Sequence, residues 1–121
     1  MRILSPMSDI KKLTDLVVAF RDARDWKQFH NPKDCAISLT LEASEVLEHF
    51  EWKNPAEIEE YLKTNKGDIA EELADVLHIV LLMSHDLGID IVDAFEKKVA
   101  INGIKYPVEK AKGNHTKHNK L

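Results

Sequence analysis

The chain is poor in cysteine and glycine, and both shortages limit what the protein can be. Its 121 residues include one cysteine, Cys35, so no disulfide can form within the chain. A lone cysteine favours a reducing compartment such as the cytoplasm, and it is more often a small core residue than a catalytic thiol. None of the four glycines belongs to a P-loop or a dinucleotide fingerprint.

The chain also lacks long apolar runs and an excess of basic residues. Its longest apolar candidate, residues 76–83, is interrupted by His78 and is much shorter than the ~20 residues that span a bilayer. The N-terminal residues contain no extended apolar stretch, so we expect no signal peptide. A net charge of −4 argues against nonspecific binding to nucleic acid, which needs a basic surface. An acidic protein can still bind an anionic ligand if a cation lies between them.

Apolar residues recur at helical spacing along most of the chain, between residues that begin or end helices. Ser8 and Asp90 suit N-caps, and Asp68 suits another, with Glu71 three residues later as in a capping box. Gly88 is a natural C-terminal stop. We predict helices over residues 8–24, 34–51, 55–63, 68–87 and 90–107.

Two segments leave a choice. Residues 35–41 alternate apolar and polar side chains, which is a strand signal, but no turn residue separates them from the helical pattern that follows, so we predict one helix. The polar stretch 64–68 is predicted to break the chain between two helices. At this length one domain is expected. We predict an all-α, bundle-like domain of four to five helices over residues 8–110, between a flexible lead-in, 1–7, and a flexible basic tail, 111–121.

Two predicted helices each carry a pair of acidic residues three positions apart, which places both side chains of a pair on one face. These pairs are Glu42 with Glu45, and Glu72 with Asp75. With a turn of ~100° per residue, Glu72 falls inside the apolar arc of its helix, and Glu42 lies beside the apolar stripe of the other. An isolated ionised carboxylate in such a setting is costly, and several together repel one another.

A solvated rim is the usual place for any single glutamate, and Glu48 fits that description. The pairing on two helices favours another interpretation, because hard divalent cations prefer oxygen ligands and remove the cost of clustered acids. We therefore predict a Mg²⁺ site between the helices, in which Mn²⁺ may substitute. Mg²⁺ held by carboxylates completes its shell with water and substrate phosphates, and it can polarise a phosphoryl oxygen.

Four stretches in order, "RDWKQFH", "LEASEVLEHFEW", "EELADVL" and "KKVAINGIKYP", resemble the all-α NTP pyrophosphohydrolases of the MazG-like type, and among these the dCTP pyrophosphatase branch. The likeness extends from about Ser8 to Lys112. It implies hydrolysis of the α–β phosphoanhydride of a nucleoside triphosphate to monophosphate and pyrophosphate, in a cytoplasmic homo-oligomer, a tetramer or alternatively a dimer. A role in cleansing the nucleotide pool is also implied.

The resemblance assigns roles to particular residues. It implies that the four paired acids hold the Mg²⁺ and that one of them helps to orient the attacking water. It also implies contacts of two further groups with the nucleotide. The residues matching base-pocket positions are Trp26, His30 and Trp52, and those matching phosphate and sugar contacts are Lys98, Asn102, Lys105 and Tyr106. Animal dCTP-specific relatives have a histidine where this chain has Val17, so the preferred base is left open.

Two other classes remain open at this stage. A di-iron or di-manganese carboxylate bundle uses Glu-x-x-His pairs, which only Asp75 and His78 approximate here. On the helical wheel His78 falls beside Glu71, on a side where solvent is expected. A noncatalytic helical oligomerisation module would explain the amphipathic helices but not the acids. Each aromatic or lysine at a proposed contact could also serve the core or a solvated face.

Overall fold

The computed structural model describes residues 8–121, so the predicted lead-in, 1–7, lies outside the described residues. The chain forms two compact units, one ending at Gly88 and one beginning at Ile89, and each is described by itself. The described part contains helices and no strand, which confirms the all-α prediction. The elements are α1 (Asp9–Ala23), η1 (Lys27–Phe29), α2 (Pro32–Glu48), α3 (Pro55–Asp86), α4 (Ile91–Lys105), α5 (Val108–Ala111) and η2 (His118–Lys120).

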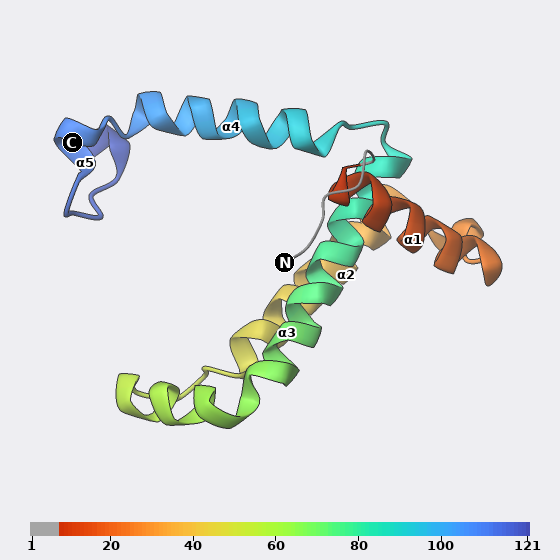
Figure 1. The fold of residues 1–121 in the computed structure, drawn as a ribbon, viewed down its shortest axis with the longest axis horizontal. Coiled ribbons are helices and arrows are strands. Elements are labelled where there is room, and N and C mark those ends of the chain that lie inside the picture. The colour runs from red at the N-terminus through yellow and green to blue at the C-terminus, as the bar shows by residue number, and fades with distance from the viewer. Residues whose placement is uncertain (1–7) are drawn as a thin grey trace. The chain divides into compact units, whose positions relative to one another are not determined.

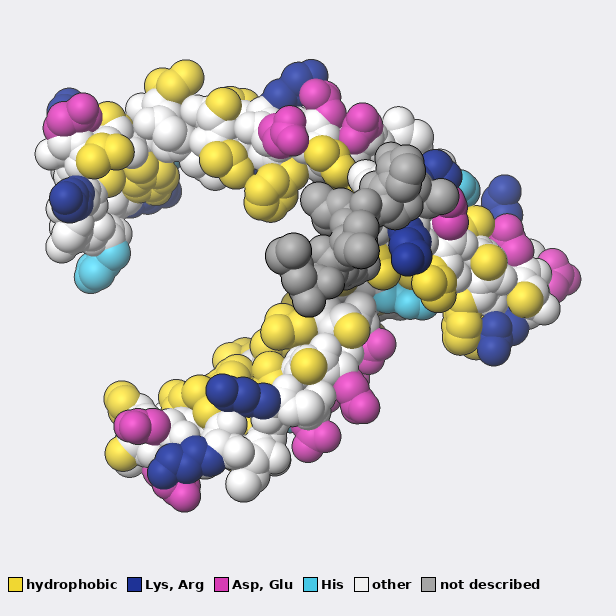
Figure 2. Space-filling model, viewed as in Figure 1, with side chains coloured by type: hydrophobic (Ala, Val, Ile, Leu, Met, Phe, Trp, Pro, Cys, Tyr) yellow, Lys and Arg dark blue, Asp and Glu magenta, His cyan; other side chains and the backbone are white. Residues whose placement is uncertain are grey.

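In the first unit α2 and α3 run antiparallel and side by side, and α1 packs against the C-terminal part of α3 (Figure 1). Figure 2 shows hydrophobic side chains gathered along the arm formed by α2 and α3, with acidic side chains along one edge. None of the described helices combines the length and the apolar character needed to cross a bilayer. The second unit contains α4, α5 and η2, and the Tyr106 and His118 rings meet edge to face at 5.7 Å within it.

Several helix ends lie where local chemistry predicts them. The Ser8 side chain accepts a hydrogen bond of 3.1 Å from the backbone N–H of Lys11, and Asp90 accepts one of 3.1 Å from Asp93. Gly88 has φ +67°, the left-handed conformation that ends α3 at little cost for glycine. The predicted first and last main helices are therefore confirmed, within two residues at each end.

The predicted start and end of the second helix were wrong by two or three residues. The helix begins at Pro32, because the Asn31 side chain accepts a 2.9 Å hydrogen bond from the backbone N–H of Asp34 and caps it. Asn31 and Pro32 together form the N-cap and N1 pair that starts helices, although the sequence prediction placed both in a loop. α2 ends at Glu48, and residues 49–52 form turns.

The predicted break at residues 64–68 was also wrong, because α3 continues through it as one helix of 32 residues. Asn54 and Glu57 form a complete capping box at its start, and no proline follows Pro55 to interrupt the backbone ladder. Gly67 lowers helix stability by only about 1 kcal/mol relative to alanine, which tertiary packing can offset. Asp68 is therefore not a cap. Figure 1 shows the axis of α3 changing direction in its first half.

The fully buried core of the first unit is small and contains a charged side chain. Arg21 is 1% exposed, and its Nη1 donates to both carboxylate oxygens of Asp86 at 2.6 and 2.8 Å. This ion pair links α1 to the last residue of α3. Large apolar side chains of α1 are partly exposed, with Leu16 at 62%. The buried hydrophobic residues in the described part are Cys35, Leu81 and Leu82.

Candidate metal centre

The antiparallel packing of α2 on α3 brings three of the four predicted metal ligands together. Glu42 and Glu45 lie one helical turn apart on α2, and Asp75 faces them from α3. One carboxylate oxygen from each lies within 4.8 Å of the others. Glu42 and Glu45 are half-buried, whereas Asp75 is exposed, so the cluster opens to solvent on one side. This arrangement presents oxygen ligands to a space that a substrate can reach.

Glu42 is the most constrained member of the cluster. Burial, followed by the charge and hydrogen bonding of Glu45 and the charges of Asp75 and Glu72, raises the pKa of Glu42 above its ordinary value. Its Oε2 is buried and has no hydrogen-bond partner in the described part of the chain. A hard divalent cation would satisfy this oxygen and neutralise the repulsion, and three carboxylates are the donor set that such a cation prefers. The residues present therefore fit a metal ion.

The fourth predicted ligand, Glu72, contacts a histidine that the sequence prediction did not use. Glu72 Oε2 contacts His49 Nε2, and His49 Nδ1 lies 2.5 Å from Tyr61 Oη. Glu72 still lies close enough to the cluster to contribute to the raised pKa of Glu42. His49 follows Glu45 by four residues and so continues the same helical face, which is the signal that could have identified it.

An aromatic cavity of about 260 Å³ adjoins the acids, with Glu42 in its lining. Trp26 and His30, both predicted at the base pocket, line it together with Phe20 and Phe29. The Phe20 ring meets Trp26 edge to face at 5.9 Å. His30 Nδ1 is buried there and has no hydrogen-bond partner among the described residues. Such a cavity suits a flat ligand with polar edges.

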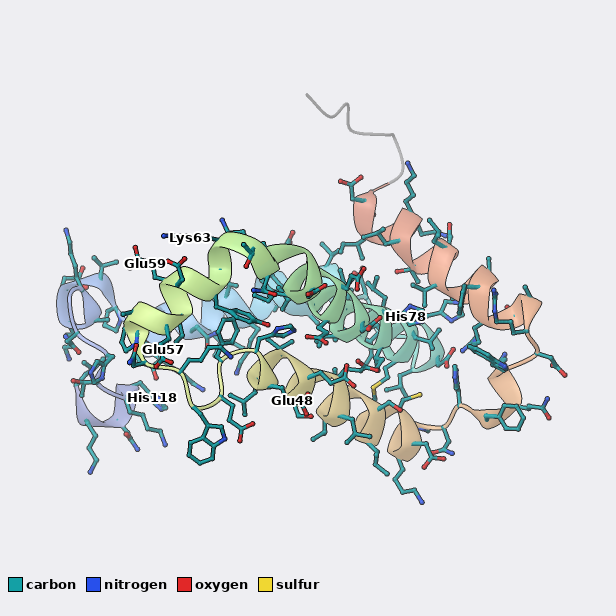
Figure 3. The ribbon with its side chains drawn as sticks, turned by 90° about the horizontal axis from the view of Figure 1, so that it is seen from below. Glu48, Glu57, Glu59, Lys63, His78 and His118 are labelled. Atoms are coloured by element: carbon teal, nitrogen blue, oxygen red, sulfur yellow. The ribbon has the colours of Figure 1, made fainter. Side chains whose placement is uncertain are left out.

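His78 does not face solvent as predicted, because it is half-buried and lines this cavity. Its ring meets Phe20 at 6.0 Å and 90°, and Figure 3 shows it on the part of α3 beside α1. The helical wheel missed this because α3 is covered on two sides, by α1 and by α2. No histidine joins the three clustered carboxylates in the described chain. Glu48 is exposed and points away from α3 (Figure 3), as a solvated acid does.

The remaining predicted contacts lie away from this cavity or in the second unit. Trp52 is 93% exposed in the turn after α2, and its φ of 66° is rare for a non-glycine residue. Lys98, Asn102 and Lys105 are exposed and follow at helical spacings of four and three, so α4 presents them on one face. Tyr106 is the C-cap of α4. Their contact with a nucleotide stays a prediction.

Cys35 is buried, as predicted for a core cysteine, and burial raises the pKa of its thiol. Such a thiol is protonated at neutral pH and is a poor nucleophile. Cys35 also borders a second cavity of about 320 Å³, which contains His85 and Asp86 in its lining. The chemistry of the first unit therefore centres on the carboxylates rather than on the sulfur.

Replacing Glu42 by glutamine is expected to stabilise the metal-free protein by about 1 kcal/mol, because one member of a repelling carboxylate cluster is removed. The same change is expected to weaken divalent-metal binding. Urea unfolding of both proteins in EDTA, followed by circular dichroism, measures the first effect. Glu48→Gln is the matched control, since Glu48 is exposed on the same helix and should shift the free energy of unfolding by less than ~0.5 kcal/mol. A destabilised Glu42→Gln variant would contradict this account of the cluster.

This chain is similar to a family model, to curated relatives and to a solved structure, and all three are of related proteins. The model of the MazG-like family matches residues 37–121. The rat dCTP pyrophosphatase 1 is 30% identical over 119 residues, which cover 97% of this chain and 70% of that protein. The human dCTP pyrophosphatase 1 is 29% identical over 119 residues, which again cover 97% of this chain and 70% of that protein. A solved pyrophosphatase structure from Archaeoglobus fulgidus superposes with a TM-score of 0.79 at 36% identity, covering 88% of this chain and 99% of that one.

Proposed function

This chain belongs to the MazG-like family of nucleotide pyrophosphohydrolases, and we propose that it hydrolyses the α–β phosphoanhydride of a (deoxy)nucleoside triphosphate to monophosphate and pyrophosphate. We propose dCTP or a related or modified deoxynucleotide as the substrate, since the two relatives compared are dCTP pyrophosphatases. The observation that carries the proposal is the carboxylate cluster beside an aromatic cavity, with Glu42 in both. Cleansing of the nucleotide pool in the cytoplasm is the matching role.

Glu42, Glu45 and Asp75, together with Glu72, would hold Mg²⁺, and Mn²⁺ may substitute. When bound, the cation supplies charge neutralisation and polarises a phosphoryl oxygen. The cluster itself repels a triphosphate, so these carboxylates can accept the substrate only with a cation between them. A carboxylate of the cluster that is not occupied by the cation can accept a proton from the attacking water and orient it.

The other residues would position the nucleotide. The faces of Trp26 and Phe20 would enclose the base, and His30 Nδ1 would hydrogen-bond one of its polar edges. Lys98 and Lys105 carry the positive charge that a pyrophosphate leaving group needs, and Asn102 and Tyr106 offer hydrogen bonds to phosphate and sugar. Because the cavity is lined mainly by apolar and aromatic side chains of α1, α2, α3 and the segment between α1 and α2, it would shield one face of the base from water.

A panel of canonical and base-modified nucleoside triphosphates tests the proposal. The purified protein with Mg²⁺ is expected to release pyrophosphate, and not orthophosphate, from at least one deoxynucleotide, and EDTA should stop the release. Absence of pyrophosphate from every nucleotide would overturn the enzyme assignment. Bound iron with an oxo-type absorption band would favour the di-metal carboxylate class, whose Glu-x-x-His pairs are not matched by the clustered carboxylates of the described residues.

We also propose that the protein is a homo-oligomer, a tetramer or alternatively a dimer. Large apolar side chains are exposed on both helices that carry the acids, including Leu41 at 59% and Leu73 at 54%. A second copy that covers such a surface would stabilise it by about 25 cal/mol per Å² of apolar area. Sedimentation velocity over a hundredfold concentration range is the measurement, and a monomer throughout would refute the assembly.

Trp52 is expected to lower stability while improving substrate binding. A fully exposed tryptophan with positive φ gains no core packing and costs about 1 kcal/mol of backbone strain. Trp52→Gly should therefore stabilise the fold by about 1 kcal/mol, since glycine adopts this conformation freely. Because Trp52 lies away from the aromatic cavity of its own chain, it would stack on a base only across the proposed homo-oligomer, and there the same variant should raise KM for the nucleotide about tenfold, since base stacking is worth about 1–3 kcal/mol. Trp52→Ala, which keeps the strain, should raise KM equally without stabilising the fold.

A further inference from the structure

Two side-chain contacts of one histidine join α2 to α3 next to the carboxylate cluster. His49, the C-cap of α2, contacts Tyr61 through Nδ1 and Glu72 through Nε2. The His49 side chain is 12% exposed and that of Glu72 is 26% exposed. Tyr61 and Glu72 both belong to α3, eleven residues apart, so one imidazole connects two separate turns of that helix.

The partners determine how His49 shares its protons. An ionised Glu72 can only accept a hydrogen bond, so His49 Nε2 must carry the hydrogen and donate it. In the neutral imidazole Nδ1 is then the acceptor, and the Tyr61 hydroxyl donates to it. Glu72 therefore fixes the tautomer of His49, and Tyr61 fixes the orientation of its ring, in the way that outer partners fix metal-bound histidines.

This contact leaves Glu72 in a defined position. A carboxylate has two oxygens, and the contact with His49 uses Oε2, so Oε1 is the oxygen that remains for a cation. Without His49, the negative charge of Glu42 would favour rotation of Glu72 away from the cluster. We infer that His49, held by Tyr61, is a positioning residue that keeps Glu72 beside the three clustered carboxylates, from where its second oxygen can join the ligands of the metal. The inference rests on the proposed metal site and assigns two residues that support one of its proposed ligands.

A purely structural role would give a different result. If His49 only attached the end of α2 to α3, its removal would lower the free energy of unfolding but leave the metal affinity of the folded protein unchanged. If His49 positions Glu72, its removal should lower the metal affinity of the folded protein only when Glu72 is present. The two roles are therefore separated by metal binding measured well below the unfolding temperature.

Mn²⁺ binding, followed by the loss of the free-ion EPR signal, is the measurement, and it needs no turnover. His49→Phe keeps an aromatic ring but cannot donate, and it should weaken Mn²⁺ binding at least about tenfold, as for outer partners of other metal sites. His49→Gln restores a donor near the position of Nε2 and should recover most of the affinity. Tyr61→Phe should weaken binding in the same direction but less. His115→Phe, in an exposed loop segment, is the matched control and should bind like the native protein.

A double-mutant cycle decides the outcome. In a Glu72→Gln background, His49→Phe should cause no further loss of Mn²⁺ affinity, because both changes remove one interaction. Equal affinity of His49→Phe and the native protein, or tighter binding by the variant, would overturn the inference. Additive losses in the double variant would overturn it as well. If the native protein itself binds no Mn²⁺, the proposed metal site fails first, so the two failures are distinguishable.

Discussion

Replacing Glu45 by glutamine is expected to lower kcat/KM for nucleotide hydrolysis by about 10³-fold or more. Glu45 is half-buried, one turn from Glu42, and shares with Asp75 the space in which a cation would sit. Glutamine has nearly the same shape but no charge, so the variant should fold normally and lose the electrostatic stabilisation of the reacting phosphate, which is often the largest single contribution to catalysis. Pyrophosphate release under saturating Mg²⁺ measures the loss.

The control for this experiment lies on the same helix. Glu48 is three residues further along α2 but exposed, so Glu48→Gln should retain activity within about twofold. Asp75→Asn should behave like Glu45→Gln, because it removes the ligand that α3 contributes. If Glu45→Gln kept more than a tenth of the native activity, or if Glu48→Gln lost as much, the assignment of the cluster as the reactive centre would be wrong.

Replacing Asp86 by alanine is expected to destabilise the fold by about 3 kcal/mol, a large part of the 5–15 kcal/mol typical of a small domain. Among the described residues, the change leaves the guanidinium of Arg21, which is 1% exposed, with the longer 3.2 Å contact to Asp22 and no other acidic partner. Removing one partner of a buried ion pair costs more than replacing both. Urea unfolding measures the change. Asp15→Ala, which removes an exposed pair with Lys11, should cost less than ~0.5 kcal/mol.

The same ion pair predicts a dependence on pH. Burial acts to raise the pKa of Asp86, but hydrogen bonds from Arg21 and His85 and their charges outweigh it, so the pKa lies below its ordinary value. The stabilisation is therefore fully present above the ordinary pKa of an aspartate and is lost as the pH falls through the lowered folded value. The free energy of unfolding should fall with acid in the native protein, and more shallowly in Asp86→Ala. Parallel curves for the two proteins would show that Asp86 does not titrate as described.

Features set by local chemistry could be predicted from the sequence. The caps at Ser8 and Asp90 and the left-handed Gly88 depend on a few neighbouring atoms, and the structure has all three. The two acidic pairs could be identified because a spacing of three residues fixes the face of a helix regardless of what surrounds it. Helical periodicity likewise predicted the all-α class, and the resemblance of four sequence stretches predicted the MazG-like family; both are confirmed.

Features set by packing could not be predicted in this way. Arg21 can be buried because it donates hydrogen bonds to Asp86, which is 65 residues away in the sequence. The residues around Arg21 in the sequence do not indicate this partner. α3 continues through residues 64–68, whereas the polar composition of that stretch favoured a break there. The contact of Glu72 with His49 likewise depends on how two helices meet, and no local pattern separates Glu72 from the other three acids.

Because α3 is one uninterrupted helix, the number of residues between its contacts determines which face of the helix each of them occupies. From Tyr61 to Asp86 each residue adds a rotation of ~100° and a rise of ~1.5 Å along the same helix. A single inserted or deleted residue between Tyr61 and Glu72 would rotate one end of the helix against the other. Either Tyr61 would lose its contact with His49, or the residues after the insertion would lose their contacts with α2 and α1. Those residues are Glu72, Asp75 and Asp86. The exposed turn and loop at residues 112–117 hold none of the site residues and have no such rule, so a change of length is tolerated there more readily.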